Sequence, residues 1–242
     1  MTIKLKYKII VLLVLSAQVL IFSACGNPII ESMLSEDIVN ETPYGEVFNT
    51  SDLSGLVAYI NNNRANYSRY NPLPLRFEGS DYGAIATVLE DKDAENKISG
   101  YSYLYLDMRG MIGEDIGYGV FKDISSKCKI VAIKLPASIT NIGGEAFYGN
   151  FDIVSISMPG VTTIGDKAFD HVYFLQEIFL PKEPPTTGGN LFSDVTTDYP
   201  FIIHVPAGTP YGEGSAYAVW VTENFVTDMI DNVHFLVNAT GN

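Results

Sequence analysis

The fold of this chain is decided by the stretch Ile-Lys-Leu-Pro-Ala-Ser-Ile-Thr-Asn-Ile-Gly-Gly-Glu-Ala-Phe at residues 133–147. Its beginning returns as Ile-Ser-Met-Pro at 156–159 and as Ile-Phe-Leu-Pro at 178–181. Its end returns as Ile-Gly-Asp-Lys-Ala-Phe at 164–169. The repeat is therefore 22 to 23 residues long, which is the length of one coil of a solenoid.

Related segments extend this repeat in both directions. Leu-Tyr-Leu-Asp at 104–107 precedes it and Ile-His-Val-Pro at 203–206 follows it, so five strand segments are expected. One coil cannot bury its own apolar side, but stacked coils bring equivalent positions into buried rows. The expected rows are Ile133, Ile156 and Ile178, then Leu135, Met158 and Leu180, with Phe147 and Phe169 filling the far end of each coil and a glycine after Ile142 and Ile164 permitting a tight corner.

These blocks carry a family resemblance. Ile-x-Leu-Pro, Ile-Thr-x-Ile-Gly and Ala-Phe together resemble the BspA-like leucine-rich repeat over roughly residues 101–206. The resemblance implies an α/β repeat fold, a right-handed solenoid of about five short parallel strands with helical caps at both ends. It also implies a bacterial surface or secreted protein that serves adhesion or protein binding. Asn150 matches the family's cysteine or asparagine position, and Cys128 is expected to be a buried repeat residue.

The segments on either side of the repeats are expected to cap them, because a solenoid must cover its terminal apolar faces. Residues 50–100 form the predicted N-terminal cap and residues 207–242 the C-terminal cap, with Trp220 in the core of the latter. The periodicity of apolar residues predicts a helix over 53–60 that begins at Ser51 or Asp52, a strand over 73–77, a helix over 85–89, a helix over 216–225 and a strand over 233–237.

The N-terminus has the pattern of an export signal. Three lysines precede an apolar run over residues 9–22, which is too short for a membrane span. The sequence Phe-Ser-Ala-Cys at 22–25 resembles the lipobox of bacterial lipoproteins, with Phe22 in place of the usual leucine. That resemblance implies cleavage after residue 24 and lipidation of Cys25. The alternative is ordinary secretory cleavage beside an incidental cysteine. Residues 1–24 are thus the predicted signal peptide and 25–49 an acidic tether.

Composition excludes several functions. The 15 Lys and Arg residues against 28 Asp and Glu residues give a formal charge of −13, so nucleic acid is not an expected partner. Two cysteines cannot build a disulfide-rich scaffold or a four-thiolate zinc site. The three histidines, His171, His204 and His234, form no metal-hydrolase motif. We therefore predict no catalytic residue, no metal and no cofactor, and a chain that is not an enzyme.

The repeat register predicts a binding surface on the outward side of the strands. The central outward row is Tyr105, Lys134, Ser157, Phe179 and His204, and the flanking row is Tyr103, Ala132, Ser155, Glu177 and Ile202. Aromatic residues are enriched at interfaces, so Phe179 favours a role in partner binding. The alternative is that the C-terminal cap covers Phe179 and Ile202.

The predicted function is that of a monomeric, membrane-anchored lipoprotein of the outer membrane or cell surface that binds a protein without catalysis. Its partner is a host matrix or envelope protein whose identity the sequence does not give, and its contact with the membrane is the lipid on Cys25. Two alternatives remain open at this stage. One is a structural or assembly role in the bacterial envelope, and the other is a hydrolase with an unrecognised site.

Overall fold

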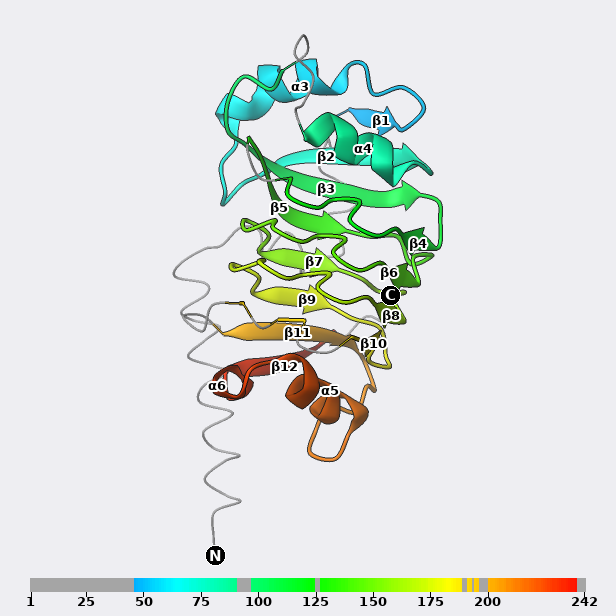
Figure 1. The fold of residues 1–242 in the computed structure, drawn as a ribbon, viewed down its shortest axis with the longest axis vertical. Coiled ribbons are helices and arrows are strands. Elements are labelled where there is room, and N and C mark those ends of the chain that lie inside the picture. The colour runs from blue at the N-terminus through cyan, green and yellow to red at the C-terminus, as the bar shows by residue number, and fades with distance from the viewer. Residues whose placement is uncertain are drawn as a thin grey trace, which may run out of the picture. The chain divides into compact units, whose positions relative to one another are not determined.

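The main feature of the fold is a sheet of eight strands in the order β1-β2-β3-β5-β7-β9-β11-β12, in which all neighbours are parallel (Figure 1). The predicted signal peptide, Cys25 and most of the predicted tether lie outside the residues that the structure describes. This computed structural model describes residues 46–90, 97–124, 127–188, 191–192, 194–195 and 200–238.

A second, smaller sheet runs beside the first. It has the order β10-β8-β6-β4 and is also parallel, so each central coil contributes one strand to each sheet. The strands of the large sheet are β1 Val47–Asn49, β2 Leu73–Gly79, β3 Ser102–Met111, β5 Cys128–Lys134, β7 Ser155–Ser157, β9 Glu177–Phe179, β11 Phe201–Pro206 and β12 Val233–Asn238. Those of the small sheet are β4 Asp115–Ile116, β6 Asn141–Ile142, β8 Thr163–Ile164 and β10 Thr186–Thr187.

The register of the central strands confirms the predicted buried rows. Ile156 of β7 lies opposite Ile133 of β5 and Ile178 of β9, and all three side chains are fully buried. Strands β5, β7 and β9 each end two residues before their proline, whereas β11 continues to Pro206. The backbone N–H of Leu135 donates to the carbonyl of Ser157, and Pro136 then has no N–H with which to continue the ladder.

The register at the first coil differs from the prediction. Leu104 lies opposite Ile130 but Tyr105 lies opposite Ala132, so Val131 is the extra residue of a bulge. Asp107, not Tyr105, is therefore the neighbour of Lys134. The sequence alignment matched Leu104 with Ile133, but Leu106 is the residue opposite Ile133, so the predicted register was wrong by two residues. Alternation of apolar residues does not distinguish registers that differ by two.

The predicted role of the repeated glycines is also wrong. Gly143 and Gly165 do not have positive φ angles. A Cβ on Gly143 would lie 2.7 Å from the carbonyl carbon of Gly117, and a Cβ on Gly165 would lie 2.4 Å from the backbone nitrogen of Gly144. These glycines are needed because backbones of successive coils approach closely. The left-handed corner residues are instead Glu145 and Lys167, with φ of 55° and 57°.

Phenylalanine rings fill the interior of the coils, as predicted. The rings of Phe121, Phe147 and Phe169 stack with successive centroids 5.5 Å apart and interplanar angles of 1° and 2°. Asn150 is buried, and its Nδ2 donates to the carbonyls of Phe121 at 2.6 Å and Phe147 at 2.8 Å. A buried amide thus satisfies backbone carbonyls of two successive coils at the family's asparagine position. Cys128 is buried, as expected.

The N-terminal cap extends the sheet as well as covering it. Its helices are α3 Leu56–Asn63, the short 3-10 helix η2 Arg64–Asn66 and α4 Tyr82–Leu89. The first helix begins later than predicted, at the N-cap Gly55, because Ser51 and Asp52 belong to a turn in which Ser51 N–H donates to Asn49 Oδ1. Val47–Asn49 was expected to be tether. It forms β1 because Phe48 packs against Phe77 and the neighbouring helix.

The C-terminal cap closes the other end with α5 Ala216–Asn224, the four-residue helix α6 Thr227–Ile230 and β12. Trp220 is buried, as predicted, and its Nε1 donates to the Pro185 carbonyl at 2.8 Å. The short α6 was not predicted, because four residues carry no readable periodicity. None of the helices in the described ranges is long and apolar enough to cross a membrane.

Candidate functional site

The predicted central row is only partly accessible. Lys134, Ser157 and Phe179 lie side by side on β5, β7 and β9 and are half-buried. Phe179 stacks on His204 with ring centroids 3.9 Å apart and an interplanar angle of 6°. His204 is fully buried, so its predicted exposure is wrong. Tyr105 is half-buried and belongs to the neighbouring row.

The flanking row is largely closed to solvent. Ala132, Ser155, Glu177 and Ile202 are buried, and of this row only Tyr103 is half-exposed. Oε1 of Glu177 lies 3.6 Å from Nε2 of the equally buried His204. The prediction that this row forms an accessible outward surface is therefore wrong for these four positions.

Accessible aromatic side chains gather instead where the parallel strands begin. Tyr101 precedes β3 and is 68% exposed, while Tyr173 and Phe174 precede β9 and are each 38% exposed. Phe151, which precedes β7, stacks on Tyr173 with centroids 5.3 Å apart and planes 5° apart. Because the starts of parallel strands share one edge of a sheet, these rings belong to a single edge.

Charged groups connect the rings at this edge. The Arg69 guanidinium lies 4.2 Å from the Phe174 ring centroid, and Lys129 Nζ lies 5.7 Å from that of Tyr101. Asp152 pairs with both cations, at 3.6 Å to Arg69 and 3.3 Å to Lys129. We call this group the aromatic edge: Arg69, Tyr101, Lys129, Phe151, Asp152, Tyr173 and Phe174.

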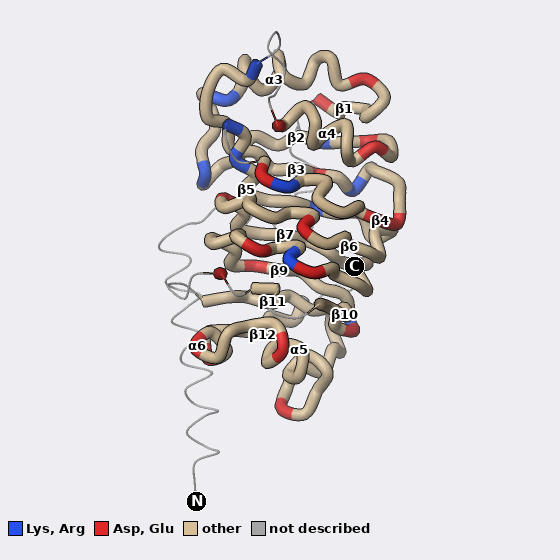
Figure 2. The backbone as a smooth tube through the Cα atoms, viewed as in Figure 1, with Lys and Arg blue, Asp and Glu red and all other residues tan. Residues whose placement is uncertain are grey.

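The aromatic edge lies in the part of the molecule that carries the basic residues. Lys and Arg occur over the N-terminal cap and the repeats, whereas no Lys or Arg follows Lys182 in the sequence (Figure 2). Sequence reasoning missed this edge because its residues fall between the recognisable blocks. The available signal was the pair Phe151 and Tyr173, which keeps the 22-residue spacing of the repeat.

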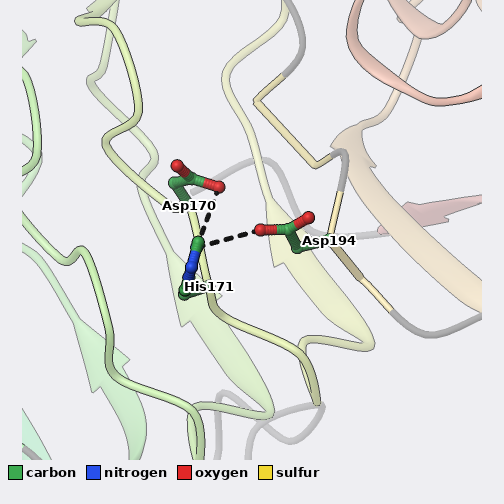
Figure 3. Close-up of side chains that lie close together, drawn as sticks. All are labelled: Asp170, His171 and Asp194. Atoms are coloured by element: carbon green, nitrogen blue, oxygen red, sulfur yellow. Dashed lines mark ion pairs between the residues drawn. The ribbon is translucent and has the colours of Figure 1, made fainter.

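A second cluster joins two successive coils beside the aromatic edge. Nδ1 of His171 lies 3.2 Å from Asp170 Oδ1 and 2.9 Å from Asp194 Oδ2 (Figure 3). The imidazole stacks on the Tyr148 ring, with centroids 4.9 Å apart, and the Tyr173 ring lies 5.7 Å away on a tilted plane. The three histidines form no metal-hydrolase motif, and no metal was predicted on that ground, but His171 lies beside two carboxylates.

The two carboxylates of this cluster perturb each other. The hydrogen bond with Asp170 raises the pKa of Asp194, and burial and the Asp170 charge act in the same direction. Burial raises the pKa of Asp170, but hydrogen bonds with Asp194 and His171 outweigh it and leave that pKa below its usual value. In the described part of the chain these three residues are close enough to hold a metal ion, since their ligand atoms all lie within 4.8 Å of one another.

Comparison with known proteins identifies the repeats. Residues 114–203 match the family model of the BspA type leucine rich repeat region, in six copies. No curated protein and no solved structure matches the chain. The match begins at the loop before β4 and ends within β11, so it covers the central coils and leaves both caps outside.

Proposed function

Because residues 114–203 belong to the BspA-type leucine-rich repeat family, we propose that this chain is a protein-binding or adhesion module of a bacterial cell surface, held there by a lipid on Cys25. The family is typical of surface and extracellular proteins without catalytic activity. Repeat solenoids offer extended surfaces that suit this task.

The observation that carries the proposal is the aromatic edge. It exposes Tyr101, Tyr173 and Phe174 beside Arg69, and Tyr and Arg are enriched among the residues that dominate protein interfaces. The stacked and cation-bearing rings are already fixed in place, so little side-chain entropy is lost when a partner covers them. Tyr105, Lys134, Ser157 and Phe179 are a second, half-buried contribution from the strands themselves.

A cell-adhesion assay tests this assignment. Cells or beads that carry the wild-type chain are compared with the double variant Tyr101→Ser and Phe174→Ser on immobilised extracellular matrix proteins. Two exposed aromatic contacts of more than about 1 kcal/mol each correspond to binding weaker by roughly tenfold or more. The matched control is Tyr118→Ser, because Tyr118 lies after β4 and, at 72%, is the most exposed large apolar residue of those the structure describes.

The outcomes of this assay separate the candidate surfaces. Equal loss in the Tyr118→Ser control, or no loss in the double variant, contradicts a role for the aromatic edge. A second double variant, Tyr105→Ser and Phe179→Ser, probes the strand row in the same assay. If binding is weakened only in this second double variant, the partner binds the outward row of the strands and not the aromatic edge.

The lipid anchor has its own test. Labelling of the chain with a fatty-acid analogue in the producing cell is expected for the wild type and lost in Cys25→Ser, whereas an ordinary secreted chain would be unlabelled in both. Protease treatment of intact cells then addresses the side of the membrane. Digestion supports adhesion, and resistance until the envelope is opened would favour an assembly role within the envelope instead.

A further inference from the structure

We propose that Asp170, His171 and Asp194 form a binding site for a divalent transition-metal ion of the Zn²⁺ type, which links two successive coils of the solenoid. The proposal is independent of the adhesion function. It concerns side chains from two different turns of the repeat, since Asp170 and His171 follow β8 and Asp194 follows β10.

The distances match the edges of a metal coordination shell. Zn²⁺ binds imidazole nitrogen and carboxylate oxygen at about 2.0–2.2 Å, so adjacent ligand atoms of a tetrahedral site lie about 3.3 Å apart. Nδ1 of His171 lies 3.2 Å from Asp170 Oδ1 and 2.9 Å from Asp194 Oδ2. The ligand atoms of all three groups lie within 4.8 Å of one another, so modest side-chain rotation would allow one ion to contact all three.

The chemistry of the ligands selects the class of ion. The carboxylates of Asp170 and Asp194 have oxygens within 4.8 Å of each other, and they repel each other unless a proton or a cation lies between them. The imidazole ligand favours transition metals over Ca²⁺ or Mg²⁺, which prefer sites made only of oxygen. The three side chains are about one fifth to two fifths exposed, so water can reach the remaining coordination positions.

The fold holds the imidazole in position before any ion arrives. The ring of Tyr148 stacks on His171, and the ring of Tyr173 lies close on a tilted plane. The backbone of the same turn is fixed by the hydrogen bond from Gly149 N–H to the Asp170 carbonyl, 3.0 Å long. Ligands whose orientation is set by their surroundings bind metals more tightly than mobile ones.

Calorimetric titration of the full chain in detergent, after chelator treatment and removal of the chelator, tests the site. We expect one Zn²⁺ per chain, with Ca²⁺ and Mg²⁺ bound at least tenfold more weakly. His171→Asn and Asp194→Asn should each weaken Zn²⁺ binding at least tenfold. Asparagine suits position 171 because it tolerates the left-handed backbone found there, with φ of 60°. The control is Asp152→Asn, an acidic residue of the aromatic edge.

Thermal unfolding gives a second readout. An ion that binds only the folded chain raises the unfolding midpoint of the wild type and leaves that of Asp194→Asn unchanged. Absence of Zn²⁺ binding, or binding that survives both substitutions, would overturn the proposal. If His171→Asn fails to fold, Asp194→Asn decides alone. If Asp152→Asn also weakened Zn²⁺ binding, the binding would not be specific to the three proposed ligands, and the proposal would be overturned.

Discussion

The coils and the C-terminal cap pack the same kind of side chain in opposite ways. Between Phe121 and Phe169 each ring is a translated copy of the one before, with interplanar angles of 1° and 2°. At Phe192 the angle to Phe169 rises to 17°, and beyond it the ring pairs have no common angle, from 29° between Phe192 and Phe225 to nearly perpendicular. Phe192 meets Trp220 at 65°, and Phe201 meets Phe225 at 73°. A repeating backbone forces parallel stacking, and a cap has to end that repetition with an irregular cluster.

The largest loss of stability is expected from a substitution in the regular stack of phenylalanine rings. Phe147→Ala removes a fully buried ring that contacts a ring on each side, and should lower the free energy of unfolding by about 4 kcal/mol. Phe147→Leu is the control, with a loss of about 1.5 kcal/mol because it keeps most of the volume. Denaturant unfolding followed by circular dichroism measures both. Similar small losses for the two variants would contradict tight packing of the stack.

The next largest loss of stability is expected where the N-terminal cap joins the repeats. Asp107 is buried, and Arg109 donates to it from Nε at 2.9 Å and from a terminal nitrogen at 2.7 Å. Arg76 lies 3.7 Å away. Arg109→Ala removes both guanidinium hydrogen bonds and leaves the buried carboxylate with the more distant Arg76 and the backbone N–H of residue 109, which is 3.2 Å away. This change should cost about 3 kcal/mol at neutral pH.

The pH dependence sharpens this second prediction. Burial raises the pKa of Asp107, but hydrogen bonds and charge from Arg109, with charge from Arg76, outweigh it and hold that pKa below its usual value. A lowered pKa stabilises the fold above about pH 4, and this contribution disappears as the pH falls through the lowered value. The difference in unfolding free energy between the wild type and Arg109→Ala should therefore decrease below pH 4. A gap that widens in acid would exclude the carboxylate as its source.

A third effect compares two coils directly. Asn150 and Val172 occupy the same place in successive coils, and both are buried. Asn150→Val makes the first coil resemble the second but removes the Nδ2 donor to the carbonyls of Phe121 and Phe147. We expect a loss of about 2 kcal/mol in denaturant unfolding, because buried acceptors lose a partner. A neutral result would mean that the side-chain amide is dispensable in this coil.

The smallest effect belongs to the cap. Trp220→Phe keeps an aromatic ring in the irregular cluster but removes the hydrogen bond to the Pro185 carbonyl. A loss of about 1 kcal/mol is expected, because crossed rings tolerate a change of shape better than a stack does. Thermal unfolding of both proteins provides the measurement. A loss as large as that of Phe147→Ala would remove the distinction between stack and cap.

The repeated part of the fold could be predicted because repetition makes each position visible more than once. Ile133, Ile156 and Ile178 confirm one another in the sequence, and the structure aligns them. At the first coil Asp107 takes the place of the repeated proline, so alternation alone set the predicted register, and it placed Tyr105 two residues away from its partner Ala132. The start of α3 at Gly55 likewise depends on how Ser51 and Asp52 serve the preceding turn, which periodicity does not reveal.

The candidate sites were less predictable than the fold. His171 and Asp194 come together only because two coils stack, and Asp194 lies in the most degenerate copy of the repeat. The burial of Glu177 and His204 also depends on three-dimensional packing, since alternation assigns them an outward face and nothing more. Adhesion, lipidation of Cys25 and the partner stay predictions.

The near-identical geometry of successive phenylalanines also makes length a separable property of this molecule. Removal of residues 154–175 would delete one coil and join Ile153 to Gln176, two positions that are consecutive within the repeat. Phe147 would then face Phe192, and the large sheet would shorten by one strand spacing, about 4.8 Å. Duplication of the same segment would lengthen it by as much. Such a protein can change its reach in fixed steps while both of its ends stay the same.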